Sequence, residues 1–242
     1  MKFAKPFLLG FFIVALVVLG FIVWANSTSG PAPEAFGALR SDAQVTVSLD
    51  QFVTFQPARK KTTTAFVFYP GARVDYRAYA VPLHKIAAEG YLVILLPMRL
   101  NLALLDVNAA DRAISAFPAI RHWIVGGHSL GGVAAAAYAS HHDNIDGLVL
   151  WASYPSNDAL KNSKIKVISI YGTQDISGAD VFENKRPLLP MDAEFVVIQG
   201  ANHAQFGDYG AQPGDPEATI SRADQQKQVV NSTAEFLKEL SQ

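Results

Sequence analysis

The sequence predicts a doubly wound α/β fold, in which helices flank a mostly parallel sheet and one transmembrane helix precedes it. Continuous apolar runs rich in Val, Ile and Phe indicate strands buried on both faces, as parallel sheets require. These runs are residues 64–69, 91–96, 122–125, 147–152, 165–170 and 194–198. Segments with helical periodicity lie between and after them, at residues 76–88, 105–116, 131–140 and 222–240. Strands that alternate with helices predict a doubly wound sheet.

The N-terminal segment indicates where the protein is located. Residues 7–24 carry no charge, and at 1.5 Å per residue they form a helix of about 27 Å, close to the thickness of a hydrocarbon core. Lysines precede this run and no basic residue follows it before Arg40. The positive-inside rule therefore predicts a cytoplasmic N-terminus at residues 1–6, a transmembrane signal anchor at 7–25 and an extracytoplasmic remainder. The alternative is a cleaved signal peptide and a secreted protein, although residues 25–27 form a poor cleavage site.

The remainder divides into a linker and one domain. Residues 26–40 are rich in Ser, Gly, Pro and Ala, which predicts a linker. Residues 41–242 then form the folded domain. At its start, residues 44–54 alternate apolar and polar side chains, which predicts a half-exposed strand at the edge of the sheet.

Composition excludes several classes of protein. Half of the residues are hydrophobic, only 17% are charged and the net charge is −1. The chain is therefore not disordered, and nucleic acid is not an expected partner. The absence of Cys excludes disulfides and thiolate metal sites. No nucleotide-binding motif occurs, and the adjacent His141 and His142 lack metal-ligand spacing, so we expect no cofactor and no metal.

A glycine-rich segment after the strand at 122–125 carries the clearest chemical signal. Gly127, Ser129 and Gly131 follow the pattern of a nucleophile elbow, in which a strained turn between strand and helix exposes the serine. The flanking glycines let strand and helix approach closely. The alternative is a glycine-rich turn that is only structural or binds phosphate.

A nucleophilic serine needs a base and an orienting acid, and in this architecture they follow it in the order acid, then base. His203 follows the strand at 194–198, and Asp175 follows the strand at 165–170, so both lie at carboxyl ends of strands. Asp180 is the rival for the acid.

An oxyanion hole needs two backbone N–H groups, one of them from the residue after the nucleophile. That residue is Leu130. The second donor is expected in the loop after the strand at 64–69, where we select Ala72, with Gly71 allowing the turn.

These motifs together resemble the α/β-hydrolase superfamily, in particular its small lidless members related to dienelactone hydrolases and carboxylesterases. The matching pieces are YPGA at 69–72, GYLVILLPMR at 90–99, GGHSLGG at 126–132, IYGTQD at 170–175 and GANHAQFGDYG at 200–210. The resemblance implies an α/β-hydrolase domain and acyl chemistry at the serine. Many members carry His-Gly where this chain has Pro70-Gly71, a departure at the expected oxyanion loop.

The expected function is a membrane-anchored extracytoplasmic serine hydrolase that cleaves a carboxylic ester or a related acyl bond. Its partners would be the membrane and a small-molecule or cell-envelope ester. The alternatives are an acyltransferase with the same triad and a non-catalytic binding domain. The short segment 154–164 leaves no room for a lid, and the loop 200–221 is either one wall of the site or a solvated loop.

Overall fold

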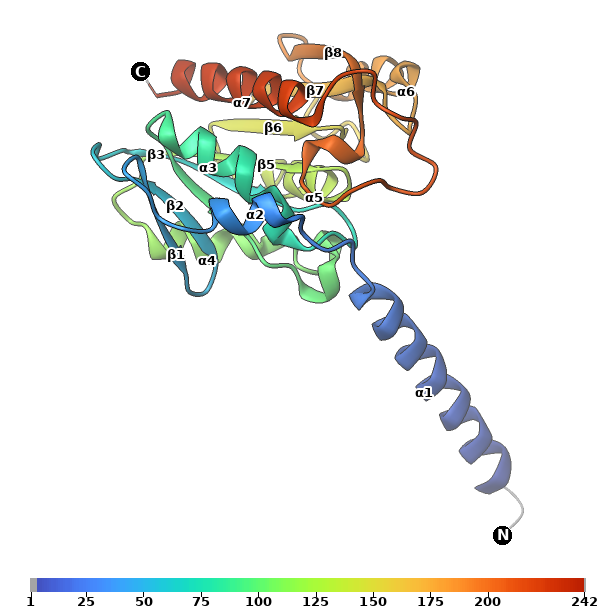
Figure 1. The fold of residues 1–242 in the computed structure, drawn as a ribbon. Helices are drawn as coiled ribbons and strands as arrows, with labels where there is room; N and C mark the ends of the chain where they lie inside the picture. The colour runs from blue at the N-terminus through green and yellow to red at the C-terminus, as the bar shows by residue number, and fades with distance from the viewer. Residues whose placement is uncertain (1–3, 242) are drawn as a thin grey trace.

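The computed structural model describes residues 4–241, and its main body is an eight-stranded sheet with the strand order β1-β2-β4-β3-β5-β6-β7-β8 (Figure 1). The strands are β1 (Val45–Leu49), β2 (Val53–Pro57), β3 (Thr64–Tyr69), β4 (Leu92–Leu95), β5 (His122–His128), β6 (Gly147–Trp151), β7 (Lys166–Gln174) and β8 (Glu194–Asn202). β1 and β2 are antiparallel to their neighbours, and all other pairs are parallel. The predicted fold class is confirmed.

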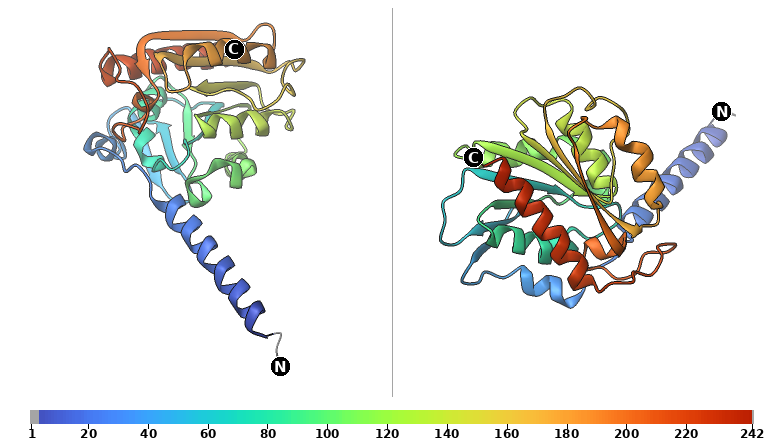
Figure 2. Two further views of the ribbon diagram at one scale, coloured as in Figure 1. Left: turned by 90° about the vertical axis from the view of Figure 1, so that its right-hand side faces the viewer. Right: turned by 90° about the horizontal axis from the view of Figure 1, so that it is seen from above.

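Helices cover both faces of the sheet (Figures 1 and 2). They are α3 (Ala80–Ala88), α4 (Ala110–Ala116), α5 (Leu130–Ala139), α6 (Ala179–Lys185) and α7 (Arg222–Glu239). Successive side chains of a strand point to opposite faces, so Phe66 and Phe68 of β3 enter the core under α3 and α7. Ala65 and Val67 enter the second core, under α4 and α5. This two-sided burial explains the continuous apolar runs.

Short 3-10 helices supplement these elements. They are Tyr76–Tyr79, Arg99–Asn101, Ala103–Leu105, Val107–Ala109, Arg186–Leu188 and Ala204–Phe206. Two predicted helices are consequently shorter than expected, because a 3-10 turn precedes α3 and irregular turns precede α4.

The segment at 44–54 was predicted as one strand, and this is wrong: it holds β1, a turn and the start of β2. Leu49 pairs with Val53, which closes a tight antiparallel hairpin. The alternation of apolar and polar side chains continues through the returning strand, so periodicity alone does not reveal the turn. Three other strands extend beyond the apolar runs, and β5, β7 and β8 end at His128, Gln174 and Asn202.

The N-terminal helix α1 (Ala4–Asn26) leaves the domain as an isolated rod (Figure 1). Its segment Leu9–Asn26 is long and apolar enough to span a membrane. Residues 1–3, part of the expected cytoplasmic N-terminus, lie outside the described residues.

Residues 26–40, expected to be a linker, are folded against the domain. They contain a short helix, α2 (Pro33–Ala38), with Pro at its first position and Ala35 buried. The backbone N–H of Ala32 donates to the carbonyl of Asp208 at 2.6 Å, and that of Ser29 donates to the carbonyl of Arg73 at 2.9 Å. A composition rich in Ser, Gly and Pro indicates that a segment forms no long helix. It does not indicate whether the segment packs against the domain.

Candidate active site

The turn between β5 and α5 has the geometry of a strained elbow. Ser129 has φ 52° and ψ −125°, a left-handed conformation rare for a residue with a side chain. A Cβ on Gly127 would lie 2.5 Å from the carbonyl oxygen of Tyr69, and one on Gly131 would lie 2.2 Å from it. Both predicted elbow glycines are therefore required by the close approach of β3.

Two hydrogen bonds hold the elbow in place. The N–H of Ser129 donates to the carbonyl of Trp151 at 3.0 Å, and the hydroxyl of Ser153 donates to the carbonyl of Ser129 at 2.7 Å. Both partners lie on or after β6, the next strand in the sheet. Ser153 was not identified from the sequence, because no local motif marks a residue that supports a turn from another strand.

His203 and Asp175 form a buried pair. Asp175 Oδ2 lies 2.8 Å from His203 Nδ1, and Asp175 Oδ1 accepts from the N–H of Ser177 at 2.8 Å. Because a carboxylate only accepts, the Nδ1 of His203 carries the proton and its Nε2 is left as an acceptor. Asp180, the rival acid, is exposed in the first turn of α6.

Ser129 and His203 face one pocket of about 190 Å³ at the carboxyl edge of the sheet. Its lining comprises Ser129, Leu130, Val133, Ala152, Ser153, Tyr154, Ser177 and His203. Among the residues that the structure describes, no hydrogen bond joins the hydroxyl of Ser129 directly to His203. Such bonds are often long in ligand-free enzymes and tighten when substrate binds.

The backbone of the His203 loop is fixed by a second carboxylate. Asp215 accepts from the N–H groups of His203 and Ala204 at 3.2 and 2.8 Å. Gln225 of α7 exchanges two hydrogen bonds with the backbone of Asn202. Burial raises the pKa of the Asp215 carboxyl. Asp215 follows His203 in the chain, and its carboxylate contacts the backbone of His203 and not the imidazole ring.

The N–H groups of the loop after β3 and of the first residue of α5 differ in whether they have an acceptor. The N–H of Gly71 donates to the Tyr79 hydroxyl at 3.1 Å, and that of Arg73 donates to the carbonyl of Asn101 at 2.9 Å. Within residues 4–241, the N–H groups of Ala72 and Leu130 donate to no acceptor. Those two groups, selected from the sequence, are thus unpaired in the described residues, as an oxyanion donor must be.

His128, the residue before Ser129, connects the elbow to the loop at 70–72 through Tyr79. Its Nδ1 lies 2.8 Å from the hydroxyl of Tyr79. The Tyr79 hydroxyl also accepts from Gly71, and it can donate its one proton to Nδ1 when the proton of His128 is on Nε2. The His128 ring lies 4.5 Å from the His203 ring, centroid to centroid. Burial, and secondly the nearby His203, hold the pKa of His128 well below its ordinary value.

This depressed pKa predicts a pH dependence of stability. The unfolded chain binds a proton at His128 below about pH 6.5 while the folded protein does not, so stability falls on acidification by up to about 1.4 kcal/mol per pH unit. His128→Asn, which keeps an acceptor for Tyr79, should flatten the dependence. Urea unfolding in detergent at pH 7.5, 6.5 and 5.5 measures it. The exposed His141→Asn is the control, and equal slopes for all three proteins would contradict the prediction.

Apart from His203, no residue of the loop 200–221 lines the pocket, and the loop's large aromatic side chains pack behind the His203–Asp175 pair. Phe206 stacks on His128 at 5.5 Å, and Tyr209 packs at 6.2 Å from Tyr79. Both aromatic side chains are buried. Val133, Tyr154 and Ser177, which lie outside this loop, contribute to the lining of the pocket.

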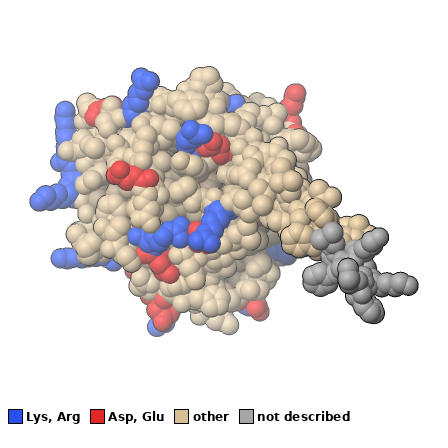
Figure 3. All heavy atoms as spheres, turned by 90° about the horizontal axis from the view of Figure 1, so that it is seen from below, with Lys and Arg blue, Asp and Glu red and all other residues tan. Residues whose placement is uncertain are grey.

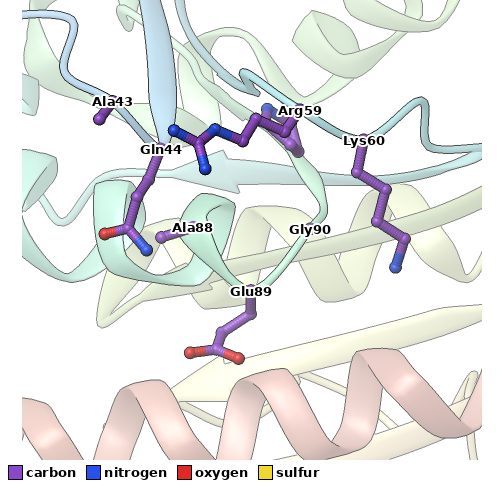
Figure 4. Close-up of a pocket in the computed structure, with 8 residues that line it drawn as sticks. Ala43, Gln44, Arg59, Lys60, Ala88, Glu89 and Gly90 are labelled. Atoms are coloured by element: carbon purple, nitrogen blue, oxygen red, sulfur yellow. The ribbon is translucent and has the colours of Figure 1, made fainter.

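Another hollow, of about 330 Å³, lies between the β1–β2 hairpin and the end of α3 (Figure 4). Gln44, Arg59, Lys60 and Glu89 line it. These side chains include no nucleophile with a base beside it, so the hollow offers no acyl chemistry. Across residues 4–241, no group of three or more His, Asp or Glu side chains has the arrangement of a metal site.

The sheet order, the serine turn after β5 and the His–Asp pair after β8 and β7 define an α/β-hydrolase architecture. Residues 65–227 match the model of the alpha/beta hydrolase family, and the chain belongs to that family. No curated protein matches the sequence significantly.

Solved structures reproduce the fold at low sequence identity. The esterase domain of a Rhodothermus marinus protein is 14% identical with a TM-score of 0.62, covering 79% of this chain and 93% of that one. Dienelactone hydrolase from Anabaena variabilis is 15% identical with a TM-score of 0.59, covering 82% and 100%. A soluble variant of monoglyceride lipase from Saccharomyces cerevisiae is 12% identical with a TM-score of 0.57, covering 84% and 97%. At such identities the likeness establishes the fold.

Proposed function

We propose that this protein is a serine hydrolase that cleaves a carboxylic ester or a related acyl bond. The observation that carries the proposal is the buried hydrogen bond between His203 and Asp175, on a pocket that it shares with Ser129 at a strained elbow. A binding domain has no need of this arrangement. The esterases and the lipase among the similar structures support the same class of reaction.

In the proposed mechanism, Ser129 Oγ attacks the carbonyl carbon while His203 Nε2 accepts its proton. Asp175 holds the ring and stabilises the imidazolium that forms. The N–H groups of Leu130 and Ala72 donate to the oxyanion of the tetrahedral intermediate. His203 then returns the proton to the leaving alcohol, and water hydrolyses the acyl-enzyme by the same steps in reverse order.

Substrate length is the first test of this function. The pocket of about 190 Å³ is small beside the several hundred Å³ of drug-sized ligand sites. Each buried CH₂ contributes about 0.8 kcal/mol, so kcat/KM should stop rising once the acyl chain leaves the pocket. We expect p-nitrophenyl esters from acetyl to hexanoyl to be preferred. A steady rise of kcat/KM through dodecanoyl, measured with dissolved monomeric esters, would contradict this.

The proposal extends to location: α1 anchors the protein in a membrane with the hydrolase domain outside the cytoplasm. Apart from the buried Ala25, the residues of Leu9–Asn26 are exposed, and such an apolar surface needs lipid around it.

Fractionation tests this anchor. The full chain should sediment with membranes and resist extraction by alkaline carbonate, because a spanning helix is held far more strongly than a surface patch. Protease added to spheroplasts should degrade the hydrolase domain. A soluble mature protein that begins near residues 26–30 would identify α1 as a signal peptide instead.

A further inference from the structure

The carboxyl end of α1 is held by the loops that border the candidate active site. The guanidinium of Arg73 donates to the carbonyls of Trp24 at 3.0 Å and Ser27 at 2.8 Å, and it lies 4.7 Å above the Trp24 ring. The side-chain amide of Asn101 donates to the carbonyl of Ala25 at 3.3 Å. Arg73 directly follows the oxyanion donor Ala72, so the anchor and the catalytic edge meet at one place.

The segment after β4, residues 99–105, reads Arg-Leu-Asn-Leu-Ala-Leu-Leu. It forms two 3-10 turns, and Leu100 and Asn101 both have positive φ, 49° and 53°. This strained backbone turns the end of the segment outward, where the Leu104 and Leu105 side chains are 48% and 50% exposed. Two adjacent exposed leucines on a strained loop stabilise the protein only when an apolar partner covers them.

The reach of the chain places these leucines near the bilayer surface. If α1 spans the membrane, Ala25 lies at the end of the 18-residue apolar span, at the boundary of the hydrocarbon core. Asn101 touches Ala25, and Leu104 follows Asn101 by three residues, so their Cα atoms are at most about 11 Å apart. The headgroup region is itself about 5–8 Å thick.

Figures 1 and 2 show the segment after β4, in green, beside the upper end of α1 and at the margin of the domain on the side toward which α1 extends. Seen from below, that side of the domain carries only scattered charges of both signs between broad uncharged areas (Figure 3). Arg99 is exposed at the start of the segment, where a cation suits anionic lipid headgroups.

We propose that residues 99–105 form a membrane-contact loop, in which Leu104 and Leu105 insert into the leaflet from which α1 emerges. The inference rests on the membrane anchor proposed above. The loop and the Arg73 contacts together form a second attachment that fixes the orientation of the domain. The carboxyl edge of the sheet, with the pocket of Ser129 and His203, is thereby held close to the lipid surface, where ester-bearing lipids are the substrates within reach.

The absence of Cys permits a direct depth measurement. Leu104→Cys is introduced into the full-length protein, labelled with the fluorophore NBD and reconstituted in 3:1 phosphatidylcholine–phosphatidylglycerol vesicles. Val17→Cys in α1 reports insertion of the anchor, and Met191→Cys, fully exposed in the loop before β8, reports water. We expect doxyl-labelled acyl chains to quench the labels at 104 and 17 several-fold more than the label at 191. Dissolved iodide, which quenches from the water, should quench the label at 191 more than the labels at 104 and 17.

The outcomes distinguish failure of the contact loop from failure of the membrane anchor. Quenching by lipid at 17 with water-like behaviour at 104 would overturn the contact loop and leave the anchor standing. Protection of the label at 104 from iodide without quenching by lipid would indicate a protein partner and overturn the loop equally. Water-like behaviour at 17 would remove the anchor and the inference with it. Unchanged circular dichroism of the labelled proteins excludes misfolding, since all three positions are exposed.

Discussion

Ser129→Ala is expected to lower kcat for ester hydrolysis by at least about 10⁴-fold while the protein stays folded. The change removes the attacking oxygen and leaves the elbow intact, because the turn is held by the backbone N–H of Ser129 on the carbonyl of Trp151 and by the close approach of Gly131 to β3. A rate assay with p-nitrophenyl acetate measures the loss, and circular dichroism measures the fold.

Ser177→Ala is the matched control. Ser177 lines the same pocket, and its contribution to the acid is made through its backbone N–H, so the variant should keep most of the activity. A fluorophosphonate probe should label the wild type and Ser177→Ala, and leave Ser129→Ala unlabelled. If Ser129→Ala retains more than a tenth of the wild-type rate, another nucleophile operates. If the wild type does not react with the probe, the domain is a non-catalytic member of its fold.

The features that could be predicted from sequence are those that a short stretch of chain determines by itself. The two glycines around Ser129 must lack Cβ because backbone carbonyls of β3 lie within 3 Å, and that requirement is visible as a spacing. His203 and Asp175 could be selected because they follow apolar runs, and the carboxyl ends of parallel strands converge. Once both residues lie at that edge, the fold brings them together and buries them, so no further sequence signal is needed to find the pair.

The features that could not be predicted depend on partners far away in the chain. Ser153 supports the elbow from β6, and Asp215 supports the backbone of His203 across a loop. Tyr79 and His128 lie 49 residues apart. Polar residues of these types are common in loops and on helices, so nothing in the local pattern separates a supporting side chain from a solvated one. The docking of residues 26–40 was missed for the same reason, since backbone groups of Arg73 and Asp208 hold that segment.

Asp175→Asn is expected to lower kcat by about 10³- to 10⁴-fold, although it is nearly isosteric. The Asn Oδ1 still accepts from the N–H of Ser177, so the loop after β7 keeps its shape. The Asn amide, however, presents a donor where the carboxylate presented an acceptor 2.8 Å from His203 Nδ1. The ring then takes the other tautomer, with its proton on Nε2, and that nitrogen no longer accepts a proton from Ser129.

The matched control is Asp180→Asn, the same chemical change five residues further along, at an exposed position in α6. It should leave kcat within about two-fold of the wild type, because surface changes away from the site have small effects. The loss in Asp175→Asn should fall on kcat, with KM little changed, since the carboxylate lies behind the base and does not touch the substrate. Near-wild-type kcat in Asp175→Asn together with a large loss in Asp180→Asn would transfer the role of the acid to Asp180. Equal, small losses of kcat in the two variants would mean that His203 works without an orienting carboxylate. That result would contradict the role inferred from the buried hydrogen bond between His203 and Asp175.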